Sequence, residues 1–282
     1  MQVEERVRAD IVEIGRRVYK RGFVASNDGN ISVRLDDDRL LMTPTGVSKG
    51  FMTPDMLVTT DLAGRKLTGD RDASSEILMH LAVYELRPDI KAVVHAHPPT
   101  ATGFAVAGIP LDRAVLAEVV TTLGSIPIAD YGTPSTTELA DAVRRYISAH
   151  DGLLLANHGA LTVAHELFAA YYKMETVEHF ARISLVARQL GGERVLSREE
   201  VDRLQNLRGR YGISAPAPLC PPDQEAEDEV SCQTVDAPSS PDARLVAALE
   251  KPRAGVLGLD DEVRLTYGEL TTLITDAVKQ LR

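Results

Sequence analysis

Segments of helical periodicity alternate with short apolar runs over about the first 215 residues, and this alternation restricts the fold to few architectures. Apolar side chains recur at helical spacing from Val3 to Val18, and Gly22 follows where a helix C-cap is expected. Short β-rich runs then cover 30–35 and 40–43, with Gly, Asp and Pro turns between them. Because helices and sheets must each bury an apolar face, the pattern predicts helices flanking one central sheet.

The remaining elements continue the alternation. We expect further strands at 56–60, 92–95, 125–129 and 153–156, and further helices at 74–86, 136–149 and 166–190. Another helix is expected directly after Pro98 and Pro99. Ser197 and Glu200 have the spacing of a capping box, which predicts the start of a last helix in this part of the chain.

The composition changes after residue 215. Residues 216–242 contain no Lys or Arg but six prolines, seven acidic residues and both cysteines. A segment of this composition buries too little apolar surface to offset the conformational entropy lost on ordering. We therefore predict a folded domain at 1–215 followed by a disordered linker at 216–243. In the C-terminal segment, 244–282, Thr266 and Glu269 form a second capping box ahead of an amphipathic helix, whose apolar face is expected to dock on a partner.

Charge and apolar content exclude several functions. The 282 residues include 31 basic and 41 acidic side chains, a net charge of -10, whereas a nucleic-acid-binding surface needs a basic face. The sequence has no apolar run close to the roughly 20 residues that a membrane-spanning helix requires. Two cysteines cannot build a disulfide framework. We therefore expect a cytoplasmic protein that binds neither nucleic acid nor membrane.

The strongest chemical signal is the pair His95 and His97 at the end of an apolar strand. Side chains alternate along a strand with a period of two, so both imidazoles of this H-x-H pattern point to the same face. Two nitrogen ligands on one side of a strand end are a common beginning of a zinc site. His158 also follows an apolar run directly, and it could complete a three-histidine set with an open position for substrate.

A polar cluster of Ser74, Ser75 and Glu76 opens one of the expected helices. A single hydroxyl is enough for an N-cap, but two hydroxyls at a helix N-terminus also suit a phosphate, because the free N–H groups and the helix dipole favour an anion. Glu76 could supply an oxygen ligand or a base beside a metal. His80, one turn further on, could support the metal ligands from behind but is interpreted first as a helix-face residue. Lys49, near the T-P-T-G turn, could assist with phosphate but is interpreted first as a solvated surface charge.

The motifs occur in an order that is typical of a known family. The chain carries N-D-G-N-I-S-V-R from residue 27, T-P-T-G from 43, S-S-E from 74, H-A-H-P from 95 and N-H-G from 157. In this order they resemble the class II aldolase/adducin family, and within it the L-fuculose-1-phosphate aldolases most closely. The resemblance covers about residues 1–215. It implies a three-layer α/β/α sandwich with a largely antiparallel central sheet, assembled as a homotetramer with active sites at subunit interfaces.

The resemblance also implies roles for individual residues. His95, His97 and His158 would bind a divalent metal, usually zinc, and Glu76 would be the fourth ligand at rest and the acid/base residue once displaced. The substrate phosphate would be held by Asn30, Thr45, Gly46, Ser74 and Ser75. The implied reaction is the aldol cleavage of a ketose 1-phosphate to dihydroxyacetone phosphate and a small aldehyde such as lactaldehyde. The metal would stabilise the enediolate as a Lewis acid, so no lysine Schiff base is needed.

The proton donor and the exact reaction stay open. The fuculose-phosphate aldolases place a tyrosine in the segment that corresponds to 109–124, which contains none here, and Tyr131 and Tyr211 are the remaining candidates. Pentulose-phosphate 4-epimerases of the family typically carry Asp in place of Glu76, and sugar-acid-phosphate decarboxylases are a further alternative. Adducin heads share the fold as interaction modules but lack the metal histidines.

The layout of the linker and the C-terminal helix resembles a targeting device. An acidic, Pro-rich segment followed by a short amphipathic helix is similar to the encapsulation peptides of bacterial microcompartment enzymes. This resemblance implies a docking partner for residues 244–282 and a location inside such a compartment.

Overall fold

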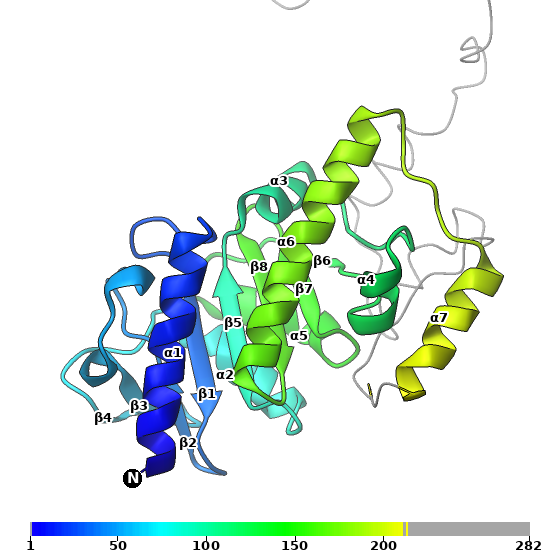
Figure 1. Ribbon diagram of the computed structural model, residues 1–282. Helices are drawn as coiled ribbons and strands as arrows, with labels where there is room; N and C mark the ends of the chain where they lie inside the picture. Colours follow the sequence, from blue (N-terminus) through cyan, green and yellow to red (C-terminus); the bar gives the residue numbers. More distant parts are fainter. Residues whose placement is uncertain (1, 211–212, 214–282) are drawn as a thin grey trace, which may run out of the picture. The chain divides into compact units, whose positions relative to one another are not determined.

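A computed structural model describes residues 2–210 and residue 213 of the chain (Figure 1). The predicted linker at 216–243 and the predicted C-terminal segment at 244–282 lie outside the described residues. Both therefore stay predictions, together with the boundary of the folded domain at residue 215.

The described part contains seven α-helices, eight strands and two 3-10 helices, η1 (Lys49–Phe51) and η2 (Pro54–Met56). The helices are α1 (Gln2–Lys20), α2 (Ile77–Leu86), α3 (Pro99–Ala107), α4 (Ala117–Thr122), α5 (Thr137–Ile147), α6 (Leu167–Gln189) and α7 (Arg198–Arg210). The strands are β1 (Asn30–Arg34), β2 (Arg39–Met42), β3 (Val58–Asp61), β4 (Lys66–Thr68), β5 (Ala92–Ala96), β6 (Ile128–Ala129), β7 (Gly152–Leu155) and β8 (Gly159–Ala164). Within these residues, none of the helices combines the length and the apolar content that a bilayer crossing requires.

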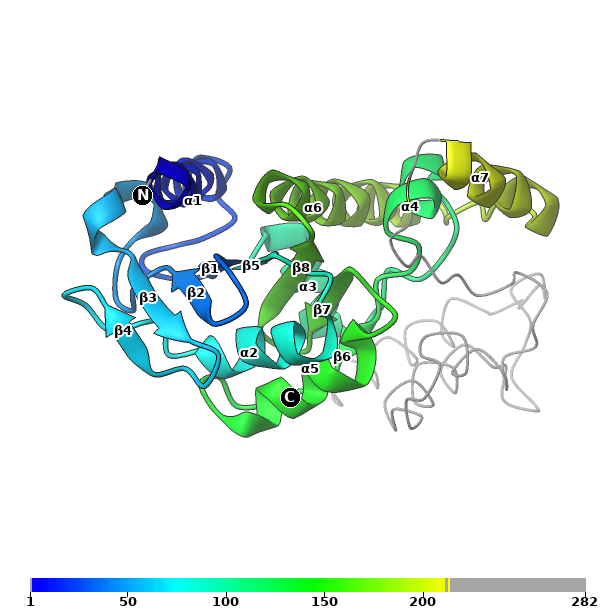
Figure 2. The ribbon, with the colours of Figure 1, turned by 90° about the horizontal axis from the view of Figure 1, so that it is seen from below.

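All eight strands form one sheet, in the order β4-β3-β2-β1-β5-β8-β7-β6. Neighbouring strands pair antiparallel except β6 and β7, which run parallel. The largely antiparallel central sheet that the resemblance implied is therefore confirmed. Helices cover both faces of this sheet and complete the three layers (Figure 2).

Each face of the sheet has its own apolar core. On one face, α1, α3 and α6 pack against side chains that include Ile31, Val94 and Leu154. On the other face, α2 and α5 pack against Val93 and Leu153. Successive residues of a strand point to opposite faces, which is why Val93 and Val94 belong to different cores. The sandwich thus buries the apolar runs of the central strands on both sides.

Three short elements, β4, α4 and β8, were not expected from the sequence. Strand β8 matters most, because it pairs with β5 on one side and β7 on the other. All six of its residues are buried, so it lacks the alternation of polar and apolar side chains that identifies a half-exposed strand. The strand expected at 125–129 is a regular strand only at Ile128 and Ala129.

Local signals end and begin helices where the sequence predicted them. Gly22 has a φ of +69°, a left-handed conformation that glycine adopts at low cost, and Phe23 N–H donates to the carbonyl of Val18 at 2.8 Å. At the start of α7, Ser197 N–H donates to the Glu200 carboxylate at 2.8 Å, and Glu200 N–H donates to Ser197 Oγ at 3.3 Å. The predicted capping box is therefore confirmed.

Candidate metal centre and substrate pocket

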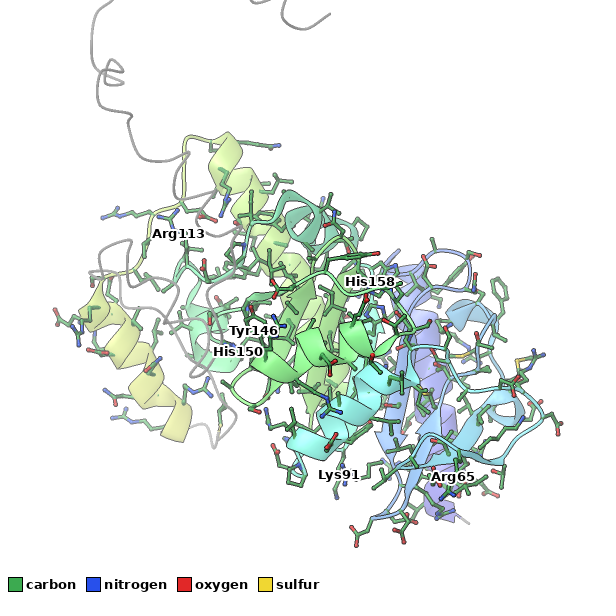
Figure 3. The ribbon with its side chains drawn as sticks, turned by 180° about the vertical axis from the view of Figure 1, so that it is seen from behind. Arg65, Lys91, Arg113, Tyr146, His150 and His158 are labelled. Carbon is green, nitrogen blue, oxygen red and sulfur yellow. The ribbon has the colours of Figure 1, made fainter. Side chains whose placement is uncertain are left out.

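The pairing of β5 with β8 brings the three motif histidines together at one end of the sheet. Because the two strands are antiparallel, the end of β5 at Ala96 lies opposite the start of β8, with Ala96 paired to Ala160. His95 and His97 therefore lie beside His158. His158 occupies the turn between β7 and β8 (Figure 3). His158, which is about 60 residues further along the chain, thus meets the His95 and His97 pair through one strand pairing that the sequence pattern did not reveal.

The other motifs lie at the same end of the sheet. Strand β1 begins there with Asn30, which is paired with His95. The turn after β2 and the segment before α2 are joined by a bridge between Pro44 and Ala73. Glu76 occupies the N-cap position of α2. One sheet end therefore collects the candidate metal ligands and the candidate phosphate-binding residues.

The three imidazole rings surround a common centre. Their ring centroids are 4.8 to 4.9 Å apart in all three pairs. One ring nitrogen from each histidine lies within 4.8 Å of the other two, and Nε2 of His97 is 3.1 Å from Nε2 of His95. The expectation that the H-x-H pair points to one face is therefore confirmed, and His158 joins it as a third nitrogen donor.

Gly159 is the reason why His158 can approach so closely. A Cβ at this position would lie 2.6 Å from the carbonyl oxygen of Ala96 and 2.6 Å from Cδ2 of the His97 ring. Both distances are far inside van der Waals contact, and the carbonyl belongs to the neighbouring strand. The glycine of the N-H-G motif thus makes space for the histidine cluster itself.

Glu76 supplies a carboxylate to the same centre. Its Oε1 lies 3.2 Å from Nε2 of His158, and its Oε2 lies 3.4 Å from Nε2 of His95. Oε1 is buried without a hydrogen-bond partner, so it is free to act as a ligand atom. Burial raises the pKa of Glu76, against the hydrogen bond from Asn30 that lowers it.

The histidines are held as neutral ligands. Burial, the largest cause in each case, lowers the pKa of His95 and of His97 and lowers that of His158 to about 4. Nδ1 of His95 donates to the carbonyl of Ala160 at 2.9 Å, which fixes the tautomer and leaves the Nε2 lone pair facing the centre. The carboxylate of Asp28 lies 3.5 Å from Nδ1 of His97 and orients this ring in the same way.

This donor set fits a divalent metal. Three imidazole nitrogens and one carboxylate oxygen are characteristic ligands of zinc, and a displaceable carboxylate leaves a position for substrate. The two Nε2 atoms that face each other at 3.1 Å and the unpartnered Oε1 of Glu76 all point to the place where a cation would be bound. His95, His97, His158 and Glu76 are therefore the residues that would hold it.

A cavity of about 210 Å³ extends from this centre to the start of α2. His97, His158 and Glu76 line it, and so do the turn at 44–46, Ser74 and Ser75. Thr45, Gly46 and Ser75 are exposed to the cavity, whereas Ser74 is buried and its Oγ accepts from the N–H of Glu76. Four of the five candidate phosphate-binding residues thus surround a helix N-terminus, where an anion is favoured.

Asn30, the fifth, is oriented toward the metal centre. Its Nδ2 donates to Oε2 of Glu76 at 2.7 Å, and its Oδ1 accepts from the ring of His80. The amide of Asn30 is therefore engaged in holding Glu76, while the residue also lines the substrate cavity. His80 was interpreted as a helix-face residue, but it is fully buried because its face of α2 packs on the sheet.

Lys49 was interpreted as a surface charge, and this was wrong. Only 2% of the residue is exposed, and its ammonium donates to the carbonyls of Asn27 and Val47 at the cavity wall. Burial lowers its pKa to about 8, so it remains mostly charged at neutral pH. Among the described residues that line the cavity, it is the one Lys or Arg. No periodic pattern in the sequence signals this burial.

The two candidate proton donors are not placed at the centre by the described structure. Tyr131 is 60% exposed and does not line the cavity, and Tyr211 lies outside the described residues. Their roles stay predictions.

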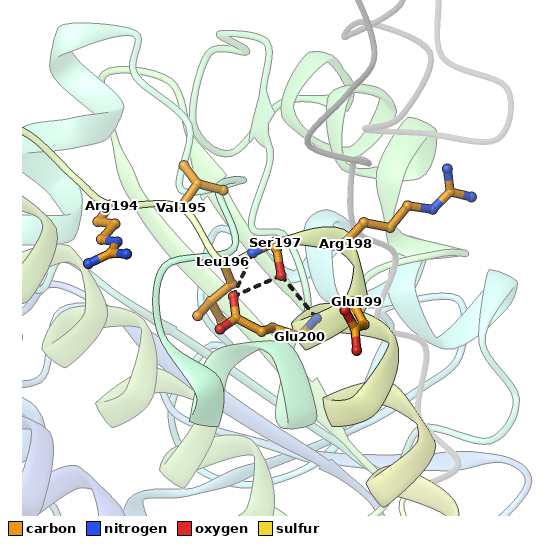
Figure 4. Close-up of a pocket in the computed structure, with 7 residues that line it drawn as sticks. All are labelled: Arg194, Val195, Leu196, Ser197, Arg198, Glu199 and Glu200. Carbon is orange, nitrogen blue, oxygen red and sulfur yellow. Dashed lines mark hydrogen bonds between the residues drawn. The ribbon is translucent and has the colours of Figure 1, made fainter.

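A larger cavity, of about 790 Å³, lies elsewhere in the fold (Figure 4). It is lined by a single continuous stretch, residues 194–200, which leads into α7 and includes the capping box. None of the candidate site residues lines it. Most of the candidate site residues instead line the smaller cavity beside the histidines.

Fold and site together define a class: an α/β sandwich with a three-histidine candidate metal centre beside an anion-suited helix N-terminus. Residues 9–185 match the model of the class II aldolase and adducin N-terminal domain, and the chain belongs to this family.

The named relatives of this chain include both decarboxylases and aldolases. The chain is 33% identical over 187 residues to a 3-oxo-tetronate 4-phosphate decarboxylase of Pectobacterium atrosepticum, a match that covers 65% of this chain and 85% of the relative. It is 33% identical over 181 residues to an L-fuculose phosphate aldolase of Methanococcus maripaludis, a match that covers 64% of this chain and 97% of the relative. The solved structure of YgbL from Escherichia coli matches with a TM-score of 0.68 at 30% identity, over 72% of this chain and 99% of YgbL.

The chain is thus an enzyme of the class II aldolase superfamily. Relatives at equal identity are named for a decarboxylation and for an aldol cleavage, both of phosphorylated sugars or sugar acids. Family membership therefore fixes the enzyme class but not the reaction.

Proposed function

We propose that this enzyme uses a bound divalent metal to cleave the C3–C4 bond of a ketose 1-phosphate, giving dihydroxyacetone phosphate and a small aldehyde such as lactaldehyde. L-Fuculose 1-phosphate is the first substrate to test. One observation carries the proposal: the Glu76 carboxylate contacts two of the three histidines and lines the same cavity as the phosphate-suited N-terminus of α2. Zinc, a homotetramer with interfacial active sites and a cytoplasmic location belong to the same proposal.

The phosphate and the reacting carbons have separate places in this site. When bound at the three histidines, the metal supplies a Lewis acid for the charge that develops on the substrate carbonyl oxygen. The hydroxyls of Thr45, Ser74 and Ser75 and the N–H groups at the start of α2 bind the phosphate. Binding at both ends of the cavity orients the C3–C4 bond beside Glu76.

The cleavage requires two proton movements. The C4 hydroxyl loses a proton as the C3–C4 bond breaks, the bonding electrons pass into the enediolate of dihydroxyacetone phosphate, and C3 then gains a proton. Glu76 is the carboxylate beside the histidines, so we assign it the proton at the carbon next to the carbonyl. Burial raises the pKa of Glu76 above its ordinary value, which favours proton uptake by this carboxylate.

A decarboxylation is the second candidate. Loss of CO₂ from a 3-oxo acid phosphate also leaves an electron pair on the carbon beside the carbonyl, so the same metal and the same Glu76 would serve. This reaction needs no base for a C4 hydroxyl. The absence of a tyrosine from residues 109–124 is the observation that favours it. A 4-epimerase is less favoured, because Glu76 stands where those enzymes typically carry Asp.

The deciding experiment compares the two products that accompany dihydroxyacetone phosphate. The zinc-loaded full chain is incubated with a panel of ketose 1-phosphates and with 3-oxo-tetronate 4-phosphate, and aldehyde and CO₂ are measured separately. We expect aldehyde release from a ketose 1-phosphate, its loss on treatment with EDTA and its return with zinc. CO₂ release without aldehyde would establish the second candidate. Turnover that is insensitive to EDTA would contradict both.

Lys49 should contribute to phosphate affinity rather than to turnover. Its ammonium is the one cationic side chain among the described residues of the cavity wall, and a charge-assisted contact to an anion contributes about 1.5–3 kcal/mol. We expect Lys49→Met to raise KM roughly tenfold or more, with kcat changed about twofold at most. Lys91→Met is the matched control, because it removes the same charge from an exposed position. Lys91 directly precedes β5, at the end of this strand opposite to His95 (Figure 3). An unchanged KM in Lys49→Met would exclude this role.

A further inference from the structure

We propose that His80 is a positioning residue: a buried chain of side chains from Tyr84 through Ser32 and His80 to Asn30 fixes the orientation of the Glu76 carboxylate at the metal centre. The inference deepens the proposed function, because it rests on Glu76 serving as metal ligand and proton carrier. It assigns a role to three buried polar residues that the cleavage chemistry does not otherwise use.

The chain is continuous in the structure. The hydroxyl of Tyr84 is 2.8 Å from Ser32 Oγ, which is 2.6 Å from Nδ1 of His80. Nε2 of His80 is 2.5 Å from Oδ1 of Asn30, whose Nδ2 donates to Oε2 of Glu76 at 2.7 Å. None of the first four residues is more than 3% exposed. The contacts join α2 to β1 across 46 to 52 residues of sequence, so they depend on the completed fold.

The donor and the acceptor of every hydrogen bond in the chain follow from the carboxylate of Glu76, at which the chain ends. An ionised carboxylate only accepts, so Asn30 must donate through Nδ2 and accept through Oδ1. Nε2 of His80 must then carry the proton, and its Nδ1 must accept from the hydroxyl of Ser32. Tyr84 in turn donates to Ser32. One charge thus determines the amide orientation of Asn30 and the tautomer of His80.

A neutral His80 is required for this arrangement, and the surroundings provide it. The ring is fully buried in the layer between α2 and the sheet, among Met79, Val83 and Val93. Burial lowers the pKa of His80 to about 3, so the imidazole keeps a single proton under ordinary conditions. No second proton is available to reverse the hydrogen bond to Asn30.

At the metal centre, the chain of hydrogen bonds gives the two carboxylate oxygens of Glu76 different roles. Oε2 is held by Asn30, while Oε1 is left buried without a hydrogen-bond partner, 3.2 Å from Nε2 of His158. Partners that orient metal ligands in this way typically change metal affinity or activity by roughly 10–100-fold when removed. A purely structural network would change stability alone.

The test is His80→Phe, which keeps an aromatic ring in the core but leaves Oδ1 of Asn30 without a donor. We expect the zinc affinity of the full chain, measured by chelator competition, to fall about tenfold, and kcat to fall about tenfold with KM for the phosphorylated substrate within about twofold. His80→Gln restores an N–H donor and should recover part of both losses. Ser32→Ala, a smaller change, frees Nδ1 of His80 and should act in the same direction to a lesser extent.

Controls separate positioning from packing. Val83→Ala opens the same layer of α2 without touching the chain, and Tyr146→Phe removes a buried phenol from α5. Both should lower Tm without changing zinc affinity. If folded His80→Phe keeps wild-type zinc affinity and kcat, or if Val83→Ala lowers zinc affinity as much, the proposal is overturned. The zinc measurement needs no substrate, so it decides this inference even if no ketose phosphate is cleaved.

Discussion

Replacing His97 with alanine is expected to abolish metal binding and turnover together while leaving the fold intact. His97 supplies one of three imidazole nitrogens to the centre. Because Glu76 is the ligand that substrate displaces, a site without His97 would hold the metal through two histidines alone once substrate binds. Lewis-acid stabilisation by a metal contributes several kcal/mol to the transition state, so we expect kcat/KM to fall by about a thousandfold or more.

His97 is the best of the three histidines for this experiment. A quarter of its side chain is exposed, whereas the side chain of His95 is completely buried and bonded to the backbone of β8. Truncating His97 should therefore leave the Tm of the metal-free protein nearly unchanged, but truncating His95 would also disturb the core. Bound zinc per chain and Tm of the metal-free protein are the two measurements.

His179→Ala is the matched control, because His179 is an exposed residue of α6. It should keep both zinc and turnover. A His97→Ala protein that retains one zinc per chain would remove His97 from the centre. A protein that loses zinc but keeps its turnover would instead separate the metal from the chemistry.

The parts of the fold that the sequence predicts are those with strong periodicity or clear end signals. Helix α1 has a regular apolar stripe and ends at Lys20, two residues before Gly22, and α7 begins at a capping box. Strand β8 has neither signal, since its Gly, Ala and Thr residues are all buried in the middle of the sheet. A local pattern cannot identify a strand whose environment is uniform on both faces.

The same limit applies to the site. The orientation of His95 and His97 could be predicted, because it depends only on the two-residue period of a strand. The meeting with His158 depends on the pairing of β5 with β8. The position of His158 after an apolar run made it a candidate third ligand, and the family resemblance supported this interpretation. The sequence left His80 and Lys49 with two interpretations each for a related reason. His80 bonds to Ser32 and Asn30, and Lys49 bonds to Asn27, at separations of 22 to 50 positions that only the folded chain brings near.

Replacing Glu76 with glutamine is expected to lower turnover far more than phosphate affinity. Glutamine keeps the size of the side chain, and its amide oxygen can still accept from Nδ2 of Asn30. It cannot carry a proton between substrate atoms, and a positioned acid/base group contributes typically 10²–10⁴-fold to the rate. With zinc supplied in excess, we therefore expect kcat to fall at least about a hundredfold, while the Kd for inorganic phosphate stays within about twofold.

Comparison with Lys49→Met tests this prediction further, because one variant should lose turnover and the other should lose phosphate affinity. Both residues line one cavity, but Glu76 contacts the histidines, whereas the Lys49 ammonium donates to the carbonyls of Asn27 and Val47. Loss of Lys49 should weaken phosphate binding and spare kcat, and loss of Glu76 should do the reverse. A fully active Glu76→Gln enzyme would remove Glu76 from proton transfer. Equal losses of kcat and phosphate affinity in both variants would mean that the cavity has no separate phosphate and reaction ends.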